Sequence, residues 1–271
     1  MEISFKNKVV LVTGASAGIG ESIALLFAKY EAKLALVGRS ESSLWAAAAS
    51  CEELSGETPL VVFADLSTDE GCELVANKTI DHFGKLDILV NNAGVGARTT
   101  IQTTDMAMFD RVFNLNVRGV YNLTRLLVPH LIKTKGNIVN ISSISGTKVS
   151  VGSLPYSMTK AALDHFTRLV ALELAPTGVR VNAVLPGFTV SKFVTRMTNY
   201  SEKEYKDWLN EAKSGIPMRE VCTGEDVAQA VLHLASDRSR LVTGALLPVD
   251  GGALFGEFGN LMERQIALCR E

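Results

Sequence analysis

The stretch that decides the fold is residues 8–20, KVVLVTGASAGIG, where a short apolar run passes into a glycine-rich turn and then into a helical pattern. Glycines at 14, 18 and 20 permit a tight turn, and the following helix directs the positive end of its dipole at a bound anion. The turn alone is a weak signal, because glycine also simply closes loops. Its position between a strand and a helix predicts a dinucleotide-binding site. No Gly-Lys-Ser/Thr follows, which excludes a Walker-type loop.

Outward from this turn, β-branched apolar runs alternate with helical patterns along the whole chain. Uninterrupted apolar strands separated by helices indicate a parallel sheet covered on both faces, so we predict an α/β fold, a Rossmann-type doubly wound parallel seven-stranded sheet. The predicted strands are Lys8–Val12, Lys33–Val37, Leu60–Phe63, Leu86–Val90, Asn137–Ile141, Arg180–Val184 and Leu246–Val249. The predicted helices are Ile19–Tyr30, Glu41–Leu54, Thr68–Phe83, Asp105–Lys133, Pro155–Leu174 and Gly224–Ser236.

The domain organisation is predicted to be a single dinucleotide-binding and catalytic domain over residues 1–271, because no linker or composition break divides the chain. Residues from about 188 to 221 form a long insertion, which we interpret as a substrate loop. Residues from about 253 to 271 extend past the last strand. For this extension we expect a short helix that packs on a neighbouring subunit or near the substrate loop, with disorder as the alternative.

Composition narrows the functional class. The net charge of −2 and a pI of about 6.1 give no electrostatic preference for nucleic acid or anionic lipid. No apolar run approaches the roughly 20 residues of a membrane span, so we expect a cytoplasmic protein. The four histidines fall on separate predicted helices and the four cysteines form no CxxC pair, so we expect no metal site and reduced thiols.

The order of several motifs resembles that of the short-chain dehydrogenase/reductase family, in its compact single-domain branch. The turn TGASAGIG is followed by Asn91-Asn92-Ala93-Gly94, Ser143, Tyr156-x-x-x-Lys160 and Pro186-Gly187, and the match covers about residues 6–252. The resemblance implies an NAD(P)-dependent oxidoreductase that moves hydride between the nicotinamide and a carbonyl/secondary-alcohol pair.

The reacting groups are predicted around Tyr156. Tyr156 and Lys160 are four residues apart and therefore share one face of a helix. A free tyrosine has a pKa of about 10, and we expect the nearby ammonium, together with the positive nicotinamide ring, to lower it so that Tyr156 serves as general acid/base. The resemblance, with the thirteen-residue spacing and a Ser-x-x-Gly pattern, selects Ser143 over Ser142 and Ser145 as the donor to the substrate oxygen. It also implies that Asn116 orients a water leading to Lys160, and that Lys160 bonds the cofactor ribose.

The cofactor is expected to be NADP(H) rather than NAD(H). Where NAD-using relatives carry an aspartate at the end of the second strand, this chain has Gly38, and Arg39 with Ser40 suits a 2′-phosphate. One residue argues against NADP(H): Ala17 stands where many NADP-using relatives place a basic residue in the glycine turn. The residues expected to contact the cofactor are Gly14, Ser16, Gly18, Ile19, Gly20, Arg39, Ser40, Asp65, Leu66, Asn92, Ala93, Gly94, Tyr156, Lys160, Pro186, Gly187, Thr189 and Ser191.

The favoured function is a carbonyl reductase acting on a hydrophobic small molecule, because the substrate loop is rich in aromatic residues. Alternatives are a dehydrogenase of steroid, retinoid or isoprenoid alcohols, a 3-oxoacyl carrier-protein reductase, and a non-catalytic NADP-binding module. The module is disfavoured since Tyr156 and Lys160 are both present. From the resemblance we also expect a homotetramer, or a homodimer, formed through the helices Asp105–Lys133 and Pro155–Leu174. Both helices carry more apolar residues than one sheet-facing stripe requires, and these could form the interface or equally be core: Val120, Leu123, Leu127, Leu163, Phe166 and Leu169.

Overall fold

The centre of the molecule is one seven-stranded sheet, all of whose strands run parallel. The computed structural model describes residues 4–198 and 200–258, and the strands lie in the order β3-β2-β1-β4-β5-β6-β7. This confirms the predicted fold class. The strands are β1 (Val9–Thr13), β2 (Lys33–Gly38), β3 (Leu60–Phe63), β4 (Ile88–Asn91), β5 (Asn137–Ile141), β6 (Arg180–Pro186) and β7 (Leu246–Val249).

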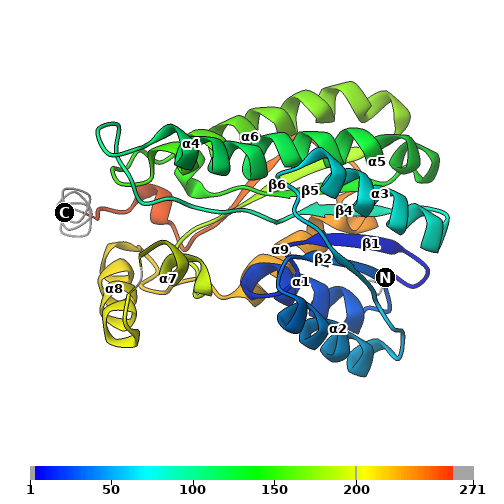
Figure 1. The fold of residues 1–271 in the computed structure, drawn as a ribbon, viewed down its shortest axis with the longest axis horizontal. Helices are drawn as coiled ribbons and strands as arrows, with labels where there is room; N and C mark the ends of the chain where they lie inside the picture. The colour runs from blue at the N-terminus through cyan, green and yellow to red at the C-terminus, as the bar shows by residue number, and fades with distance from the viewer. Residues whose placement is uncertain (1–3, 199, 259–271) are drawn as a thin grey trace.

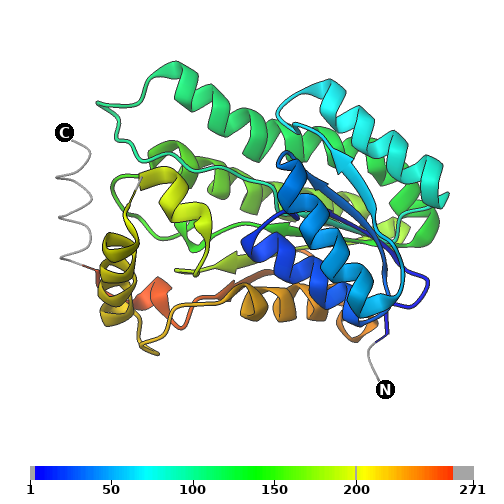
Figure 2. The same ribbon diagram turned by 60° about the horizontal axis from the view of Figure 1, so that its bottom comes forward.

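Helices cover both faces of the sheet, as Figures 1 and 2 show. On one face lie α1 (Gly18–Lys29), α2 (Glu41–Ser55) and α9 (Gly224–Ala235), and on the other α3 (Asp69–Phe83), α5 (Val120–Thr134) and α6 (Leu154–Leu174). Each layer closes its own hydrophobic core against the sheet, so the central strands are buried on both sides. This explains why their sequences are apolar without alternation.

The strand boundaries lie within two residues of the predicted ones, and one helix differs more. The single helix predicted from 105 to 133 is interrupted: α4 (Met106–Phe113) passes into a π-helical segment, Asn114–Gly119, before α5 begins. Wide turns of this kind are common at functional sites. In this protein the π-helical segment carries Asn116, one of the predicted site residues.

The substrate loop contains two helices that the sequence analysis did not predict. These are α7 (Lys192–Thr198) and α8 (Glu202–Gly215), and Figure 1 shows them beyond the carboxyl ends of the strands. The start of α8 did have a local signal. Ser201 and Glu204 form a reciprocal capping box, in which each side chain accepts a hydrogen bond from the other residue's backbone N–H.

The apolar residues singled out on the two long helices divide into two groups. Val120, Leu123, Leu127 and Leu163 are buried in the core, so they give no support to a subunit interface. Phe166 is half-buried, while Leu169 is 54% exposed. Tyr121 and Leu172, which were not singled out, are 56% and 78% exposed on α5 and α6. The exposed apolar surface of α5 and α6 is therefore formed by Tyr121, Leu169 and Leu172, and only Leu169 was among the residues expected there.

Within the described residues, no helix has the length and apolarity needed to span a membrane. In the same part of the chain, no three His, Cys, Asp or Glu side chains gather as metal ligands would. Cys51, Cys72 and Cys222 are buried free thiols, and Cys269 lies outside the described residues.

Candidate active site

A cavity of about 520 Å³ lies at the carboxyl ends of the strands, where the chain leaves β1 and β4 in opposite directions across the sheet. This is the switch point at which doubly wound sheets bind nucleotides. All eighteen residues that the sequence predicted as cofactor contacts line it, and so does Ser143. Asn116 is not among the described lining residues.

The glycine turn forms one wall of the cavity. Gly14 and Gly18 have φ of +66° and +61°, which side chains rarely adopt, and a Cβ on Gly20 would collide with the Gly14 carbonyl and the Asn92 amide. Ala17 occupies the N-cap position of α1, and its side chain accepts no hydrogen bond from the helix. The first backbone N–H groups of α1 therefore remain available to a ligand. A backbone cradle at an uncapped helix N-terminus fits a dinucleotide pyrophosphate.

Hydrogen bonds join this turn to the segment after β4. The Asn92 side-chain amide donates to the Thr13 carbonyl at 2.8 Å and to the Gly14 carbonyl at 3.2 Å. In return, the Thr13 hydroxyl accepts from the backbone N–H groups of Asn92 and Ala93, both at 2.9 Å. These bonds fix the two sides of the switch point relative to each other. Asn92 therefore has a structural role that its position in a motif did not reveal.

At the far end of the cavity, Arg39 and Asp65 face each other. Their side chains are 63% and 45% exposed, and the Arg39 Nη1 to Asp65 Oδ2 distance is 3.9 Å. Gly38 has no side chain, so no carboxylate occupies the end of β2. A Cβ at this position would touch Ser16 and Leu44 at 3.4 Å. Asp65 does not cap α3. Its carboxylate accepts from the Ser67 backbone and hydroxyl at 3.0 and 2.8 Å, and Thr68 provides the cap.

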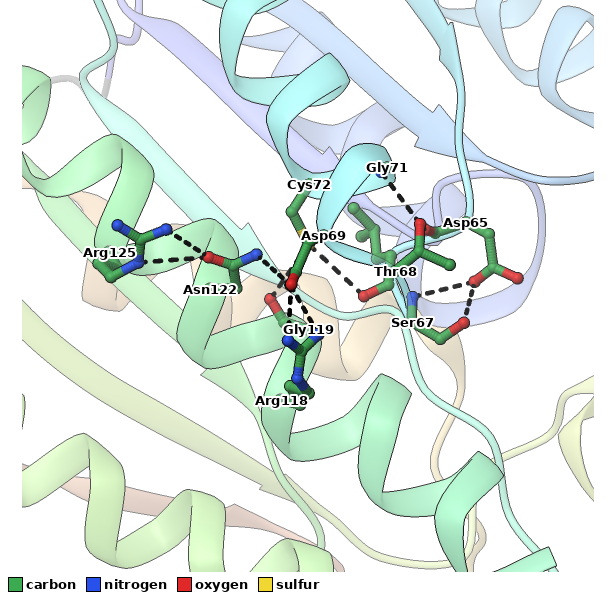
Figure 3. A network of polar contacts seen from close by, with 11 residues as sticks. Asp65, Ser67, Thr68, Asp69, Gly71, Cys72, Arg118, Gly119, Asn122 and Arg125 are labelled. Atoms are coloured by element: carbon green, nitrogen blue, oxygen red, sulfur yellow. Dashed lines mark hydrogen bonds and ion pairs between the residues drawn. The ribbon is translucent and has the colours of Figure 1, made fainter. Parts of the chain in front are cut away.

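The loop that carries Asp65 is held against the π-helical segment by the polar network in Figure 3. Asp69 forms a bidentate pair with Arg118, with both N–O distances 2.6 Å, and also accepts from the Asn122 amide at 2.8 Å. The Arg118 guanidinium lowers the pKa of the Asp69 carboxyl. The network connects the loop after β3 to the helix that carries Asn116, and so links the cofactor end of the cavity to the reacting end.

Tyr156 and Lys160 stand on the first turns of α6 and both line the cavity. The Lys160 ammonium is buried, donates to the Ile141 carbonyl at 2.7 Å and lies 5.5 Å from the centroid of the Tyr156 ring. Ser143 hydrogen-bonds Tyr156, while its own hydroxyl accepts from the Ser145 N–H at 3.1 Å. Tyr156, Ser143 and Lys160 thus meet at one point, as their spacing predicted.

Burial governs the electrostatics of Tyr156 and Lys160. Burial raises the pKa of Tyr156 to about 12, and the hydrogen bond with Ser143 opposes that rise. Burial also lowers the pKa of Lys160 to about 8, opposed by the Asp164 carboxylate. In the protein without cofactor, burial therefore has a larger effect on the Tyr156 pKa than Lys160 does. The protein alone holds Tyr156 as a phenol, the form that donates a proton.

Asn116 lies behind the cavity wall with its amide fully used. Its oxygen accepts from the Val95 N–H at 2.9 Å, and its nitrogen donates to the Val95 carbonyl at 2.8 Å and to the Thr159 hydroxyl at 3.1 Å. A Cβ on Gly94 would lie 3.4 Å from the Asn116 oxygen and 3.8 Å from the Lys160 nitrogen. The observed contacts of the Asn116 side chain fix the loop after β4 next to Lys160.

Three residues that the sequence analysis did not single out also shape the site. Asp164 is buried one helical turn beyond Lys160, and its Oδ1 has no hydrogen-bond partner in the structure. Its i,i+4 spacing from Lys160 was a signal that could have found it. Lys148 and Phe258 line the cavity from the loop after β5 and from the C-terminal extension. No local pattern marks these two residues, because only the tertiary structure brings them to the site.

The geometry defines an oxidoreductase site, with a phenol and a serine hydroxyl facing a dinucleotide cradle. The family model described as Enoyl-(Acyl carrier protein) reductase matches residues 14–253. The chain is 36% identical to (+)-borneol dehydrogenase 2 of Salvia officinalis, over 91% of this chain and 89% of that protein.

Two solved structures share the fold at similar identity. One is L-sorbose reductase from Gluconobacter frateurii complexed with NADPH and L-sorbose, 33% identical with a TM-score of 0.88 over 94% of this chain and 99% of that one. The other is 3-ketoacyl-(acyl-carrier-protein) reductase from Brucella melitensis complexed with NADH, 32% identical with a TM-score of 0.83 over 93% and 100%. The chain belongs to the short-chain dehydrogenase/reductase family and is an oxidoreductase of the CH–OH/C=O class.

Proposed function

We propose that the protein is an NADP(H)-dependent carbonyl reductase for a hydrophobic substrate. The observation that carries the proposal is the meeting of the Tyr156 phenol, Ser143 and buried Lys160 in one cavity with the glycine cradle. The lining of the reacting end combines the serines and lysines near Tyr156 with apolar side chains, among them Phe188, Phe193, Met197 and Trp208. Such surroundings favour a neutral, apolar carbonyl compound.

In the proposed mechanism the nicotinamide cofactor, when bound, supplies or accepts hydride. Ser143 binds the substrate oxygen and holds it next to the Tyr156 hydroxyl. Tyr156 then donates its proton to that oxygen as negative charge develops there, and takes a proton from the alcohol in the reverse direction. Lys160, as an ammonium, binds the cofactor ribose and favours the phenolate that remains after proton transfer. Asn116 acts as a positioning residue, because it holds the segment next to Lys160.

The preference for NADP(H) rests on Arg39 and Ser40. With Gly38 at the end of β2, the region next to the ribose carries a guanidinium and a hydroxyl in place of a carboxylate. The Asp65 carboxylate at 3.9 Å from Arg39 also pre-orients this guanidinium at the cavity rim. A 2′-phosphate would gain a charge-assisted hydrogen bond from Arg39. The other predicted contacts would hold the adenosine (Asp65, Leu66, Asn92, Ala93, Gly94), the pyrophosphate (Gly14, Ser16, Gly18, Ile19, Gly20) and the nicotinamide (Pro186, Gly187, Thr189, Ser191).

A second candidate is a dehydrogenase that oxidises an isoprenoid alcohol, favoured by the likeness to borneol dehydrogenase. It would use the same residues in the opposite direction. We further propose that the whole chain works as one domain in the cytoplasm. The exposed Tyr121, Leu169 and Leu172 on α5 and α6 support association of these helices in a homotetramer or homodimer.

The test is the change in nicotinamide absorbance when the purified protein is mixed with NADPH or NADH and a panel of ketones, quinones and steroids. We expect oxidation of NADPH by an apolar ketone, and NADPH affinity at least about tenfold above that for NADH. Arg39→Ala should reduce the NADPH affinity and leave the NADH affinity unchanged. Equal affinities for both cofactors in the wild-type protein, unaffected by Arg39→Ala, would contradict the cofactor assignment.

A further inference from the structure

The last described residues of the chain form part of the cavity wall. Residues 253–258, which we call the C-terminal segment, follow β7 and begin with a short 3₁₀ turn at Ala253–Phe255. The segment ends with Phe258, which lines the cavity and is only 7% exposed. Its ring centroid lies 4.9 Å from that of Phe188, which in turn lies 5.6 Å from that of Trp208. These three residues, from the β6–α7 connection, α8 and the C-terminal segment, form an aromatic wall.

Lys148 holds the C-terminal segment from the side of the reacting groups. It lies between Ser143 and Tyr156 in the chain, and its ammonium donates to the Gly256 carbonyl at 2.7 Å and to the Leu254 carbonyl at 3.4 Å. The same nitrogen lies 4.9 Å from the centroid of the Phe258 ring. A cation over an aromatic face is attractive, so Lys148 fixes both the backbone and the ring.

The end of α8 holds the segment from the opposite side. A Cβ on Gly215 would collide with the Phe258 ring, and a Cβ on Gly256 would collide with the Gly215 carbonyl. The two backbones therefore pack directly on each other. By contrast, Phe255 in the same segment is 89% exposed. Of the two aromatic rings in the C-terminal segment, that of Phe258 lines the cavity and that of Phe255 faces solvent.

The charges around the cavity restrict what this wall accepts. The charged residues among the described lining residues are Arg39 and Asp65 at the cofactor end, and Lys148 and Lys160 at the reacting end. Both lysines at the reacting end already donate to backbone carbonyls. A neutral substrate needs no charged partner, so it leaves these bonds intact.

We propose that Phe258 is a specificity-determining residue, which limits the size of a flat apolar group next to the carbonyl carbon, and that Lys148 positions it. The proposal rests on the proposed function, because the group it selects is that of the carbonyl substrate. Neutral cyclic or aryl ketones are the class that fits an aromatic wall in the cavity that Tyr156 and Ser143 also line. The C-terminal extension thereby becomes part of the substrate site.

The kinetic test compares cyclohexanone with 4-phenylcyclohexanone, which differ by one phenyl group. Phe258→Ala should raise the ratio of kcat/KM for the larger over the smaller ketone at least about tenfold, because removing the ring makes room for the phenyl group. Lys148→Met should raise the same ratio by less. Phe255→Ala is the matched control from the same segment and should leave the ratio unchanged. Phe258→Leu serves as the second variant if Phe258→Ala does not fold.

A binding test separates this inference from the proposed function. The chain has two tryptophans, and Trp45 is 51% exposed on α2, so a Trp45→Phe background leaves Trp208 in the aromatic wall as the reporter. Quenching of its fluorescence gives the Kd of 4-phenylcyclohexanone in the presence of oxidised cofactor, with no turnover needed. We expect Phe258→Ala to lower this Kd about tenfold and Phe255→Ala to leave it unchanged.

The two tests fail in different ways. If the wild-type protein binds the ketones but reduces none, the proposed function is wrong, and the Kd of Phe258→Ala still decides the inference. If the folded Phe258 variants show the wild-type ratio and the wild-type Kd, Phe258 does not determine specificity. If the wild-type protein binds neither ketone, the assigned substrate class is wrong.

Discussion

The two ends of the cavity are built on different physical principles. At the dinucleotide end, the backbone itself is the binding surface, and Gly14 and Gly20 are required because a Cβ would have no room. At the substrate end, side chains from the β6–α7 connection, α8 and the C-terminal segment pack into an aromatic wall. The first end depends on local geometry and the second on tertiary packing. Mutations should therefore separate cofactor binding from substrate binding.

The largest effect on cofactor affinity should come from Gly20→Ala. The added methyl group would press on the Gly14 carbonyl and the Asn92 amide, and so distort the turn that binds the pyrophosphate. A loss of about 3 kcal/mol from such overpacking corresponds to a roughly hundredfold weaker cofactor affinity, measured by calorimetric titration. Gly56→Ala, at the end of α2, meets open space but strains a backbone with φ of +73°, so it controls for backbone strain away from the site and should bind cofactor normally. Unchanged affinity in Gly20→Ala would remove the distinction between the two ends.

Trp208→Ala should affect the other end. Trp208 is 9% exposed and packs against Phe188 and Tyr205. Its removal therefore leaves a cavity among the buried apolar side chains at the substrate end. We expect the free energy of unfolding to fall by about 3 kcal/mol in urea titrations. The cofactor affinity should stay within about twofold of the wild-type value. A loss of cofactor affinity as large as in Gly20→Ala would show that the two ends are not separable.

The pH dependence should reveal the part of Asp164. The pKa of Lys160, about 8, is held up by the Asp164 carboxylate against the effect of burial. Lys160 carries its charge below this pKa and loses it above, so kcat/KM for reduction should decline as pH rises through about 8. Removing the negative neighbour in Asp164→Asn lowers the Lys160 pKa further. The alkaline limb should then move to lower pH by about one unit.

Profiles of kcat/KM against pH, from about pH 6 to about pH 10, check this prediction. The groups next to Lys160 that titrate are Tyr156 and Asp164, and Arg168 adds a positive charge beside Asp164. A limb that stays in place in Asp164→Asn, or moves to higher pH, contradicts the positioning of Lys160 by Asp164.

The smallest effect should come from Thr68→Ala. Its hydroxyl accepts from the Gly71 N–H at 3.1 Å and caps α3, next to the loop that carries Asp65. Loss of the cap should lower the free energy of unfolding by about 1 kcal/mol. The effect on NADPH affinity should be about twofold, because the network of Figure 3 still holds the loop. Thr68→Ser keeps the cap and should behave as wild type in both measurements.

The difference between the two ends also decides how much the sequence could predict. The strands, the parallel sheet and the turn from Gly14 to Gly20 follow from apolar runs and glycine spacing, which are local signals. Ser143, Tyr156, Lys160 and most other cofactor contacts were predicted from the family resemblance, and the structure brings them together in the cavity. Helix α8 was not predicted, although the Ser201–Glu204 capping box was present.

Other features had no local signal. Phe258 reaches the site only because Lys148, more than a hundred residues earlier in the chain, binds the carbonyls around it. The pKa of Tyr156 could not be predicted from spacing, since i,i+4 geometry gives the neighbour but not the burial that raises it. The same holds for Val120, Leu123, Leu127 and Leu163, whose burial in the core depends on which face of each helix meets the sheet.

The central claim, that Tyr156 transfers the proton, is tested most directly by Tyr156→Phe with an apolar ketone and NADPH. The ring and its contact with Phe193 remain, and only the hydroxyl that bonds Ser143 is lost. We predict a fall in kcat/KM of about 100- to 10,000-fold, with NADPH affinity within about twofold of wild type. Turnover that continues at the wild-type rate in Tyr156→Phe would contradict the assignment.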